Sequence, residues 1–292
     1  MAGRARGKFT LEEMRHGKAS KTALRVAIRR AAHQLVDPPP VLVDPVAVQL
    51  IGSDYARDME RAQHKVARDF RAFLAARSRY TEDCLAGAVA AGVRQYVVLG
   101  AGLDTFACRN PWAELRVYEV DYPATQAWKR DLLEEKGIAG PASLTFVPLD
   151  FEHRALSDAL AEAGFDCTQP ACVSWLGVAP YLTREAFRAT LAAVGSLPAG
   201  SVLTFDIVFA PETLSAERQV IFARLHKKLL EAGEPMRLFL RPEELGDELQ
   251  RAGFQSFQTV DTDRLNELYF QNRADGLRLS PVRIGLLATA RV

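Results

Sequence analysis

With 292 residues and 32.2 kDa, the chain is long enough to bury a full hydrophobic core as one large domain or two small ones. Its composition is that of an ordinary globular protein, and a net charge of +1 excludes a strong general attraction to nucleic acid or membranes. The longest nearly unbroken apolar stretch, 85–93, is too short to cross a bilayer, and no apolar segment follows the basic start. We therefore expect a cytoplasmic protein that binds neither nucleic acid nor membrane.

The first 93 residues have a helical pattern. After Ser20, a suitable N-cap, apolar residues repeat at helical spacing at Leu24, Ile28, Ala31 and Leu35. A second apolar helical face runs from Met59 to Leu74, and the proline-rich segment 36–48 should separate the two as an extended loop. Nine of the first thirty residues are Lys or Arg, which suits either a nucleic-acid-binding arm or, as we favour, a tail leading into a helix.

From residue 94 onward, predicted strands and helices alternate. The strands are expected at 95–99, 115–120, 144–148, 171–175, 201–208, 255–260 and 283–290. Helices are expected at 124–136, 154–164, 184–194 and 212–232, and another has Pro242 in its first turn and Gly253 just beyond its end. Such alternation implies parallel strands joined by right-handed crossovers, and the last strand suits an antiparallel position. The prediction is a doubly wound α/β sheet of seven strands.

The ends of the first three predicted strands carry glycines and carboxylates. The first strand runs into Gly100, Ala101 and Gly102, whose backbone can turn sharply and approach a ligand. The second strand ends at Asp121 and the third at Asp150. A doubly wound sheet binds ligands at the carboxyl ends of its strands. An acid after the second strand can accept hydrogen bonds from both ribose hydroxyls of an adenosine, and one after the third can bind the adenine amine.

Asp104 and Thr105 help to choose between two adenosine ligands. A carboxylate at Asp104 suits the ammonium and sulfonium of S-adenosylmethionine (SAM) and would repel a pyrophosphate. The dinucleotide fingerprint also requires a third glycine where Thr105 stands. We therefore predict SAM as the cofactor. An NAD(P)-dependent oxidoreductase is the alternative, although the chain has no recognisable Tyr-x-x-x-Lys pair, and a non-catalytic SAM-binding protein stays open.

Several spaced motifs resemble the leucine carboxyl methyltransferase-like family, especially its bacterial O-methyltransferases of polyketide and secondary metabolism. These motifs include LGAGLDT, YEVDYP, VPLDFE, SWLGVAPYL, ARSRY and YFQNRADGLR. The resemblance runs from about Asp44 to the end. It implies a Rossmann-like class I SAM-methyltransferase fold, with a helical cover over 1–93, a SAM-binding core over 94–292 and a helical lid at about 210–240.

The resemblance also implies roles for cofactor-binding residues. Gly100 matches the glycine that meets the methionine part of SAM, Asp121 the ribose acid, and Asp150 with Phe151 the pair that flanks the adenine. In the family an arginine ahead of the first strand holds the cofactor carboxylate, a bidentate pairing that guanidinium geometry favours. The motif ARSRY offers Arg77 and Arg79, and the spacing does not decide between them.

The acceptor side has weaker candidates. His153 suits either a general base or a surface histidine. Trp175 and Tyr181 suit either the acceptor pocket or the core, and Arg273 either the fold or the substrate. The eukaryotic branch has a glutamate where Leu176 stands, so a small or peptide-like bacterial acceptor is expected rather than a protein phosphatase.

The reaction that we expect is methyl transfer to oxygen, preferably of a carboxylate, which is already ionised near neutral pH and needs no general base. A hydroxyl acceptor would need one. The five histidines and four cysteines show no metal-ligand spacing, so we predict no metal.

Overall fold

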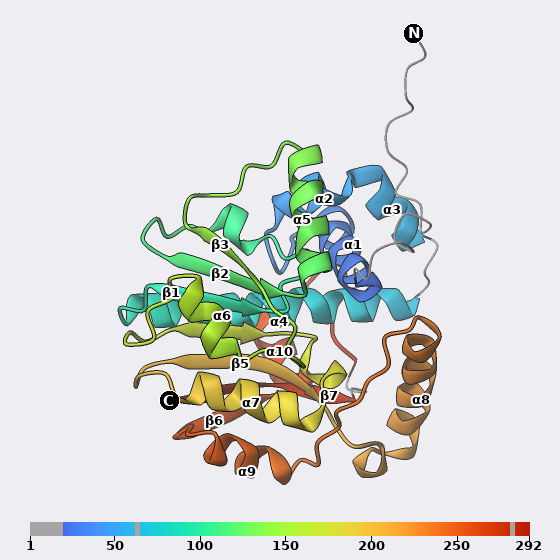
Figure 1. Cartoon of the computed structure of the whole chain (residues 1–292). Helices are drawn as coiled ribbons and strands as arrows, with labels where there is room; N and C mark the ends of the chain where they lie inside the picture. Colours follow the sequence, from blue (N-terminus) through green and yellow to red (C-terminus); the bar gives the residue numbers. More distant parts are fainter. Residues whose placement is uncertain (1–19, 62–64, 281–283) are drawn as a thin grey trace.

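Seven strands form one mixed sheet in the computed structural model, which describes residues 20–61, 65–280 and 284–292 (Figure 1). They are β1 (Gln95–Leu99), β2 (Arg116–Asp121), β3 (Leu144–Pro148), β4 (Cys172–Trp175), β5 (Val202–Val208), β6 (Ser256–Val260) and β7 (Gly285–Arg291). Their order is β3-β2-β1-β4-β5-β7-β6, and β7 is antiparallel to both of its neighbours. The seven predicted strands, and the antiparallel final strand, are confirmed to within two residues at each end.

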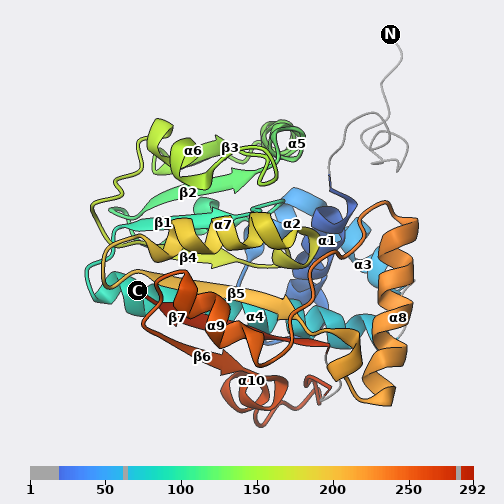
Figure 2. The ribbon, with the colours of Figure 1, turned by 60° about the horizontal axis from the view of Figure 1, so that its bottom comes forward.

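The carboxyl ends of the parallel strands point toward a group of helices at one edge of the sheet (Figure 2). This group contains α1 (Lys21–Val36), α2 (Pro45–Ile51), α3 (Ser53–Arg61) and α8 (Ala216–Glu231). Ser20 caps α1 as predicted, because its side chain accepts a hydrogen bond from the Ala23 amide. The expected ligand-binding edge therefore lies beneath three helices from the N-terminal part of the chain and beneath α8.

Two predictions for the N-terminal helices were wrong. The extended loop expected over 36–48 ends at Asp44, whose side chain accepts from the Ala47 amide and starts α2. Pro45 fits the first turn of that helix, because backbone amides there have no hydrogen-bond acceptor within the helix. A proline, which has no amide hydrogen, therefore loses no hydrogen bond at this position. The apolar face from Met59 to Leu74 belongs to two helices, α3 and α4 (Lys65–Ala90), and Ala62 between them lies outside the described residues.

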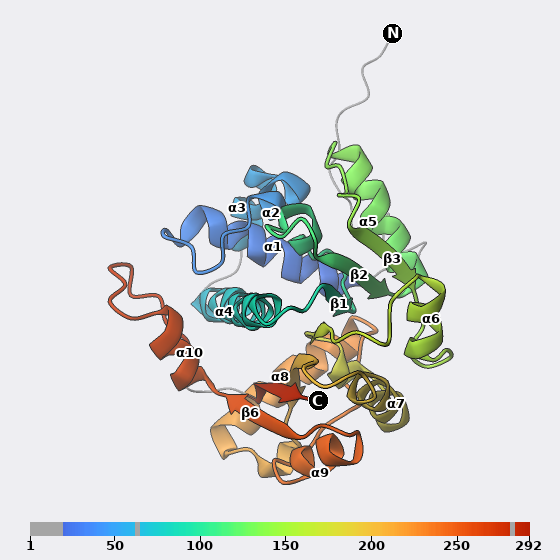
Figure 3. The same cartoon turned by 90° about the vertical axis from the view of Figure 1, so that its left-hand side faces the viewer.

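Helices cover both faces of the sheet (Figure 3). On one face, α6 (Leu156–Glu162), α7 (Arg184–Gly195) and α9 (Glu244–Arg251) pack around Trp175 and Phe187. On the other face, α4 packs with α10 (Thr262–Tyr269), and α5 (Pro123–Glu135) connects β2 to β3. None of the helices in the described part of the chain has both the length and the apolar character that crossing a bilayer requires.

The insertion between β5 and α9, residues 209–240, lies over the carboxyl end of β5, and we call it the lid. Its apolar side chains pack on Tyr181 and are Leu214, Phe222, Leu229 and Met236. The amides of Arg237 and Leu238 donate to the Pro180 carbonyl at 2.7 and 3.0 Å. The Glu234 carboxylate accepts hydrogen bonds from the Ser20 hydroxyl, at 2.9 Å, and from the Thr22 amide, at 3.1 Å. These contacts join the lid to the start of α1 and to the segment that follows β4.

Candidate functional site

The glycine turn after β1 is enclosed on two sides. Gly100 and Gly102 have φ angles of 67° and 52°, a region that residues with a side chain rarely adopt. A Cβ on Gly100 would lie 2.1 Å from Cγ2 of Val178, and one on Gly102 would lie 3.0 Å from Cβ of Ala23 in α1. Ala101 between them is buried. The turn thus lies between the segment after β4 and the first turn of α1.

Replacing Gly100 with alanine should therefore destabilise the protein more than replacing Gly52. Both glycines have positive φ, but a Cβ on Gly52 would meet nothing within 4 Å. Gly52→Ala thus measures the backbone cost alone, whereas Gly100→Ala adds overpacking against Val178, worth about 1–3 kcal/mol. Chemical denaturation of the two variants gives the difference. Equal losses of unfolding free energy would show that Val178 moves aside without cost.

Asp121 at the end of β2 joins the first two strand ends. Its Oδ2 accepts the Gly102 amide, and its Oδ1 accepts the Tyr122 amide at 2.6 Å. Burial raises the pKa of this carboxyl group, and the two amide hydrogen bonds partly offset that effect. The side chain is only half-buried. Because a carboxylate offers about four lone-pair sites, Asp121 can still accept hydrogen bonds from ligand hydroxyls.

Asp150 and Phe151 follow β3, the edge strand of the sheet. The Asp150 carboxylate accepts the Glu152 amide at 3.0 Å and lies 3.0 Å from His153 Nδ1, while Phe151 packs partly buried against the main core. The His153 side chain is 80% exposed. β3 lies two strands from β1, which corresponds to about 10 Å. His153 is thus a surface histidine at the edge of the sheet, away from the glycine turn.

Arg77 and Arg79 lie on α4 but face different surroundings. The Arg77 Nη1 lies 2.5 Å from Asp206 Oδ2 on β5, and its side chain is 10% exposed. Arg79, 46% exposed, pairs with Asp83 at 2.8 Å. Nε of Arg77 is buried and has no hydrogen-bond partner in the described part of the chain. Arg77 is therefore the arginine of the ARSRY motif that lies at the strand ends.

Two of the acceptor-side candidates make contacts within the fold. Trp175 is fully buried in the main core and stacks on Phe187 with 5.4 Å between ring centroids. Arg273 donates to the Pro39 carbonyl at 2.6 Å and pairs with Asp275 at 2.7 Å. It joins the C-terminal part of the chain to the proline-rich loop. The surroundings of Trp175 fit the core alternative and those of Arg273 the fold alternative, and a part for either residue in substrate binding stays a prediction.

Tyr181, the third acceptor-side candidate, lies under the lid. It packs against the apolar cluster around Phe222, and its hydroxyl interacts with the Thr22 side chain. Burial raises the pKa of Tyr181, so the phenol stays protonated near neutral pH and can donate a hydrogen bond. The side chain is half-buried, between the start of α1 and the end of β4.

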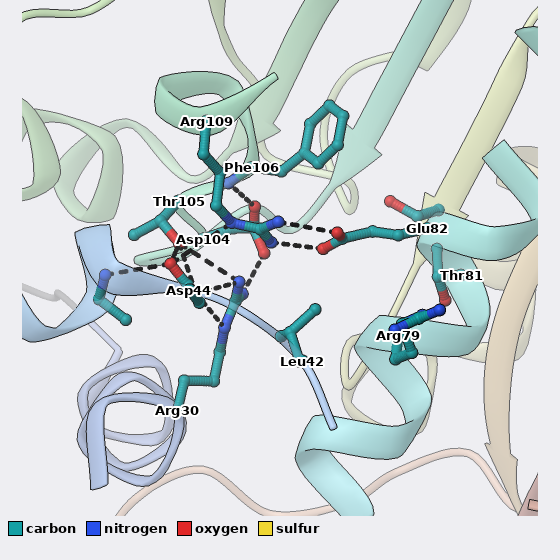
Figure 4. Close-up of polar contacts among 12 residues, drawn as sticks. Arg30, Leu42, Asp44, Arg79, Thr81, Glu82, Asp104, Thr105, Phe106 and Arg109 are labelled. Carbon is teal, nitrogen blue, oxygen red and sulfur yellow. Dashed lines mark hydrogen bonds and ion pairs between the residues drawn. The ribbon is translucent and has the colours of Figure 1, made fainter. Parts of the chain in front are cut away.

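Asp104 belongs to a buried ionic cluster that the sequence did not reveal (Figure 4). Arg30 of α1 bonds to both Asp104 and Asp44, the latter at 2.7 Å. Thr105 donates to Asp44 at 2.7 Å, and Arg109 pairs with Glu82 of α4. The cluster fastens the N-terminal helices to the loop that follows the glycine turn.

The cluster also changes the interpretation of Asp104. Burial alone would raise the pKa of its carboxyl group, but Arg30, then Lys129 and Arg109, outweigh burial and hold the pKa well below its usual range. The Phe106 amide donates to the same carboxylate at 2.7 Å, and 22% of the side chain is exposed. Arg30 thus pairs with Asp104 within the protein, and the contact of Asp104 with a ligand cation stays a prediction.

Comparisons with known proteins identify the family. Residues 23–195, more than half of the chain, match the family described as leucine carboxyl methyltransferase. A Bacillus subtilis relative, the candidate S-adenosyl-L-methionine-dependent methyltransferase YktD, is 33% identical over 293 residues, which cover 90% of this chain and 95% of that protein. The chain belongs to the leucine carboxyl methyltransferase family. It is therefore a SAM-dependent methyltransferase, and neither the oxidoreductase nor the non-catalytic alternative is favoured.

Further relatives of this methyltransferase agree. A candidate SAM-dependent methyltransferase from Mycolicibacterium gilvum is 36% identical over 209 residues, 64% of this chain and 65% of that one. Two crystal structures have the same fold at low identity. A DUF574 family protein from Streptomyces avermitilis has a TM-score of 0.57 at 19% identity, covering 94% of this chain and 98% of its own. A candidate methyltransferase from Thermobifida fusca has a TM-score of 0.54 at 18% identity, covering 88% and 98%. The predicted class I methyltransferase fold is confirmed.

The residues at the strand ends of this methyltransferase fit SAM. The Asp121 carboxylate, half-buried beside the turn, keeps lone pairs for the ribose hydroxyls. The buried Nε of Arg77 lacks an acceptor that a ligand carboxylate could supply. Among the residues described, no group of three or more His, Cys, Asp or Glu is arranged to hold a metal ion. The site therefore offers hydrogen-bonding groups for both ends of the cofactor.

Proposed function

We propose that this methyltransferase esterifies a carboxylate of a small or peptide-like molecule, with a hydroxyl acceptor as the less favoured case. The observation that carries the proposal is the set of titratable side chains at the ends of β4 and β5: Arg77, Asp206 and Tyr181. Arg77 and Asp206 neutralise each other, and the pKa of Tyr181 is raised. None of these groups is a good proton acceptor near neutral pH, so an acceptor that is already ionised suits the site best.

Two of the three histidines that the structure describes support the same conclusion. His33 is bonded to Asp37 and to the Val41 amide, and His153 lies at the β3 edge. His226 stacks on Phe222 within the lid, with 5.5 Å between ring centroids, and its buried Nδ1 has no hydrogen-bond partner among the described residues. The matched family is described by the methylation of a leucine carboxyl group, which is also an oxygen acceptor of this kind.

In this mechanism the protein positions reactants rather than moving protons. When bound, SAM would supply an electrophilic methyl group, whose bond to the sulfonium sulfur would break as the bond to the acceptor oxygen forms, leaving S-adenosylhomocysteine. Asp121 would accept the ribose hydroxyls, Arg77 would bind the cofactor carboxylate, and the amides of the glycine turn would lie near the methionine part. Asp150 and Phe151 would flank the adenine. The Tyr181 hydroxyl donates to the acceptor carboxylate, and the closed lid excludes water that would otherwise solvate the nucleophile.

The lid also supports a small acceptor. It is anchored to Pro180 by two backbone hydrogen bonds and to the start of α1 by Glu234. An acceptor must either fit beneath the closed lid or present a narrow end to it. A folded protein surface would require these contacts to break, whereas a metabolite or the end of a peptide would not.

Base lability of the product tests the carboxylate directly. The protein is incubated with methyl-labelled SAM and a pool of small carboxylic acids from bacterial extract, and the product is treated with mild base. A methyl ester releases volatile labelled methanol, which is the expected result. The Asp121→Ala variant, which lacks the ribose ligand, is the control for background transfer. A product stable to base would be an ether or a methylated nitrogen and would reject the carboxylate.

A further inference from the structure

The guanidinium of Arg77 is restrained by three neighbours, although it lies near the end of a long side chain. Its Nη1 pairs with Asp206 Oδ2 at 2.5 Å, and its central carbon lies 6.0 Å from the centroid of the Phe73 ring. Gly177 adjoins the two terminal nitrogens: a Cβ there would lie 3.2 Å from Nη1 and 3.3 Å from Nη2. The φ angle of Gly177 is 70°, a conformation that suits glycine.

These contacts leave one edge of the guanidinium available. Asp206 occupies Nη1, Nε is buried without a partner, and Nη2 has no hydrogen bond to any residue that the structure describes. Nε and Nη2 together form the side-on fork that binds a carboxylate through two parallel hydrogen bonds. The pairing with Asp206 therefore uses the one terminal nitrogen that lies outside this fork.

Asp206 also fixes the loop that faces the fork. Its Oδ1 accepts the Gly177 amide at 2.6 Å, while Oδ2 holds Arg77. Gly177 precedes Val178, whose side chain closes over Gly100 of the glycine turn. The buried Asp206 carboxylate on β5 thus holds both Arg77 and the segment that follows β4, which packs against the glycine turn.

We propose that Asp206 is a positioning residue for cofactor binding, which orients Arg77 so that its Nε–Nη2 edge binds the carboxylate of SAM. This inference rests on the assignment of Arg77 to the cofactor carboxylate made above. Asp206 touches neither the methyl group nor the acceptor. Its effect should therefore be confined to ligands that carry the amino-acid end of the cofactor.

Two ligands separate this role from a purely structural one. S-adenosylhomocysteine (SAH) carries the amino-acid end, whereas 5′-methylthioadenosine keeps the adenosine and sulfur but lacks it. Calorimetry with the full-length protein measures both affinities in Asp206→Asn, in Arg77→Ala and in the wild type. The asparagine keeps an oxygen for the Gly177 amide but removes the charge. Asp83→Asn is the matched control, because the Arg79–Asp83 pair is an exposed ion pair on the same helix.

We expect Asp206→Asn to weaken SAH binding by about tenfold or more, the scale of lost charge-assisted hydrogen bonds, and to leave methylthioadenosine binding unchanged. Asp83→Asn should change neither affinity. Equal losses for both ligands would show a structural role and overturn the proposal, as would unchanged SAH affinity. If Arg77→Ala itself leaves SAH affinity unchanged, the assignment of Arg77 is wrong. If only Arg77→Ala weakens binding, that assignment stands and the role of Asp206 fails. Methylthioadenosine binding also reports whether each variant retains a folded adenosine site.

Discussion

Replacing Arg30 with methionine should cost about 3–5 kcal/mol of unfolding free energy, the usual penalty for removing one partner of a buried ion pair. Arg30 is almost fully buried and is bonded to Asp44, Asp104 and Thr105. Without it, Asp44 and Asp104 would stay buried, with Arg109 as an arginine that still interacts with both carboxylates. The predicted loss is large because the cluster joins α1 to the loop after β1.

Chemical denaturation near pH 8 measures this loss, and Arg25→Met, an exposed position on the same helix, is the control. In the wild type the pKa values of Asp44 and Asp104 are lowered, so their stabilisation is complete above the ordinary carboxyl pKa and is lost only in strong acid. In Arg30→Met, burial should raise these pKa values. Protonation of the two carboxylates then removes the cost of burying their unpaired charge. The difference in unfolding free energy between Arg30→Met and the wild type should therefore narrow as the pH falls. A loss equal to that of Arg25→Met would show that the cluster contributes little.

Replacing Asp121 with alanine should lower the affinity for SAH at least tenfold, because each hydrogen bond to a charged group contributes about 1.5–3 kcal/mol. The substitution removes the proposed acceptor of two ribose hydroxyls. It also frees the Gly102 amide that holds the glycine turn against β2. The protein should stay folded, because Asp121 is only half-buried and forms no ion pair among the contacts of the described residues.

Calorimetry with SAH and with methylthioadenosine tests this assignment, since both ligands carry the ribose. Both affinities should fall together in Asp121→Ala, in contrast to the selective loss expected for Asp206→Asn. Asp83→Ala is a control for removing a carboxylate from the surface. Wild-type affinity for both ligands in Asp121→Ala would mean that the ribose binds elsewhere.

The strands were predictable because their signal is local. Most are short apolar runs bounded by turn residues, and the alternation with helices implies the parallel pairing. Two helices were harder to find. α2 begins inside a proline-rich segment, where Pro45 occupies the one helical position that suits it. α10 is only eight residues long and buries only Thr262 and Leu265, so few residues mark it as a helix.

The site residues could be predicted where the strand order of the backbone brings them together. They could not be predicted where the site depends on contacts between side chains that are distant in sequence. Gly100 and Asp121 lie together because both end neighbouring parallel strands. Whether Arg77 or Arg79 faces the sheet depends on how α4 is rotated about its axis. The spacing of the two arginines in the sequence does not indicate that rotation. The ion pair between Asp104 and Arg30 was not predicted, because the two residues lie 74 positions apart in sequence. Charged side chains in the apolar faces of predicted helices were the signal that could have indicated this cluster.

A crystal structure of the protein with SAH bound tests the central claim most directly, namely that SAM lies across the carboxyl ends of β1, β2 and β3, with its carboxylate on Arg77 of α4. We predict that both ribose hydroxyls donate to Asp121 and that the ligand carboxylate binds the Nε–Nη2 edge of Arg77, with Asp206 still on Nη1. A complex in which the ribose contacts another residue, or in which Arg79 or a lysine holds the carboxylate while Arg77 keeps no ligand contact, would contradict the account.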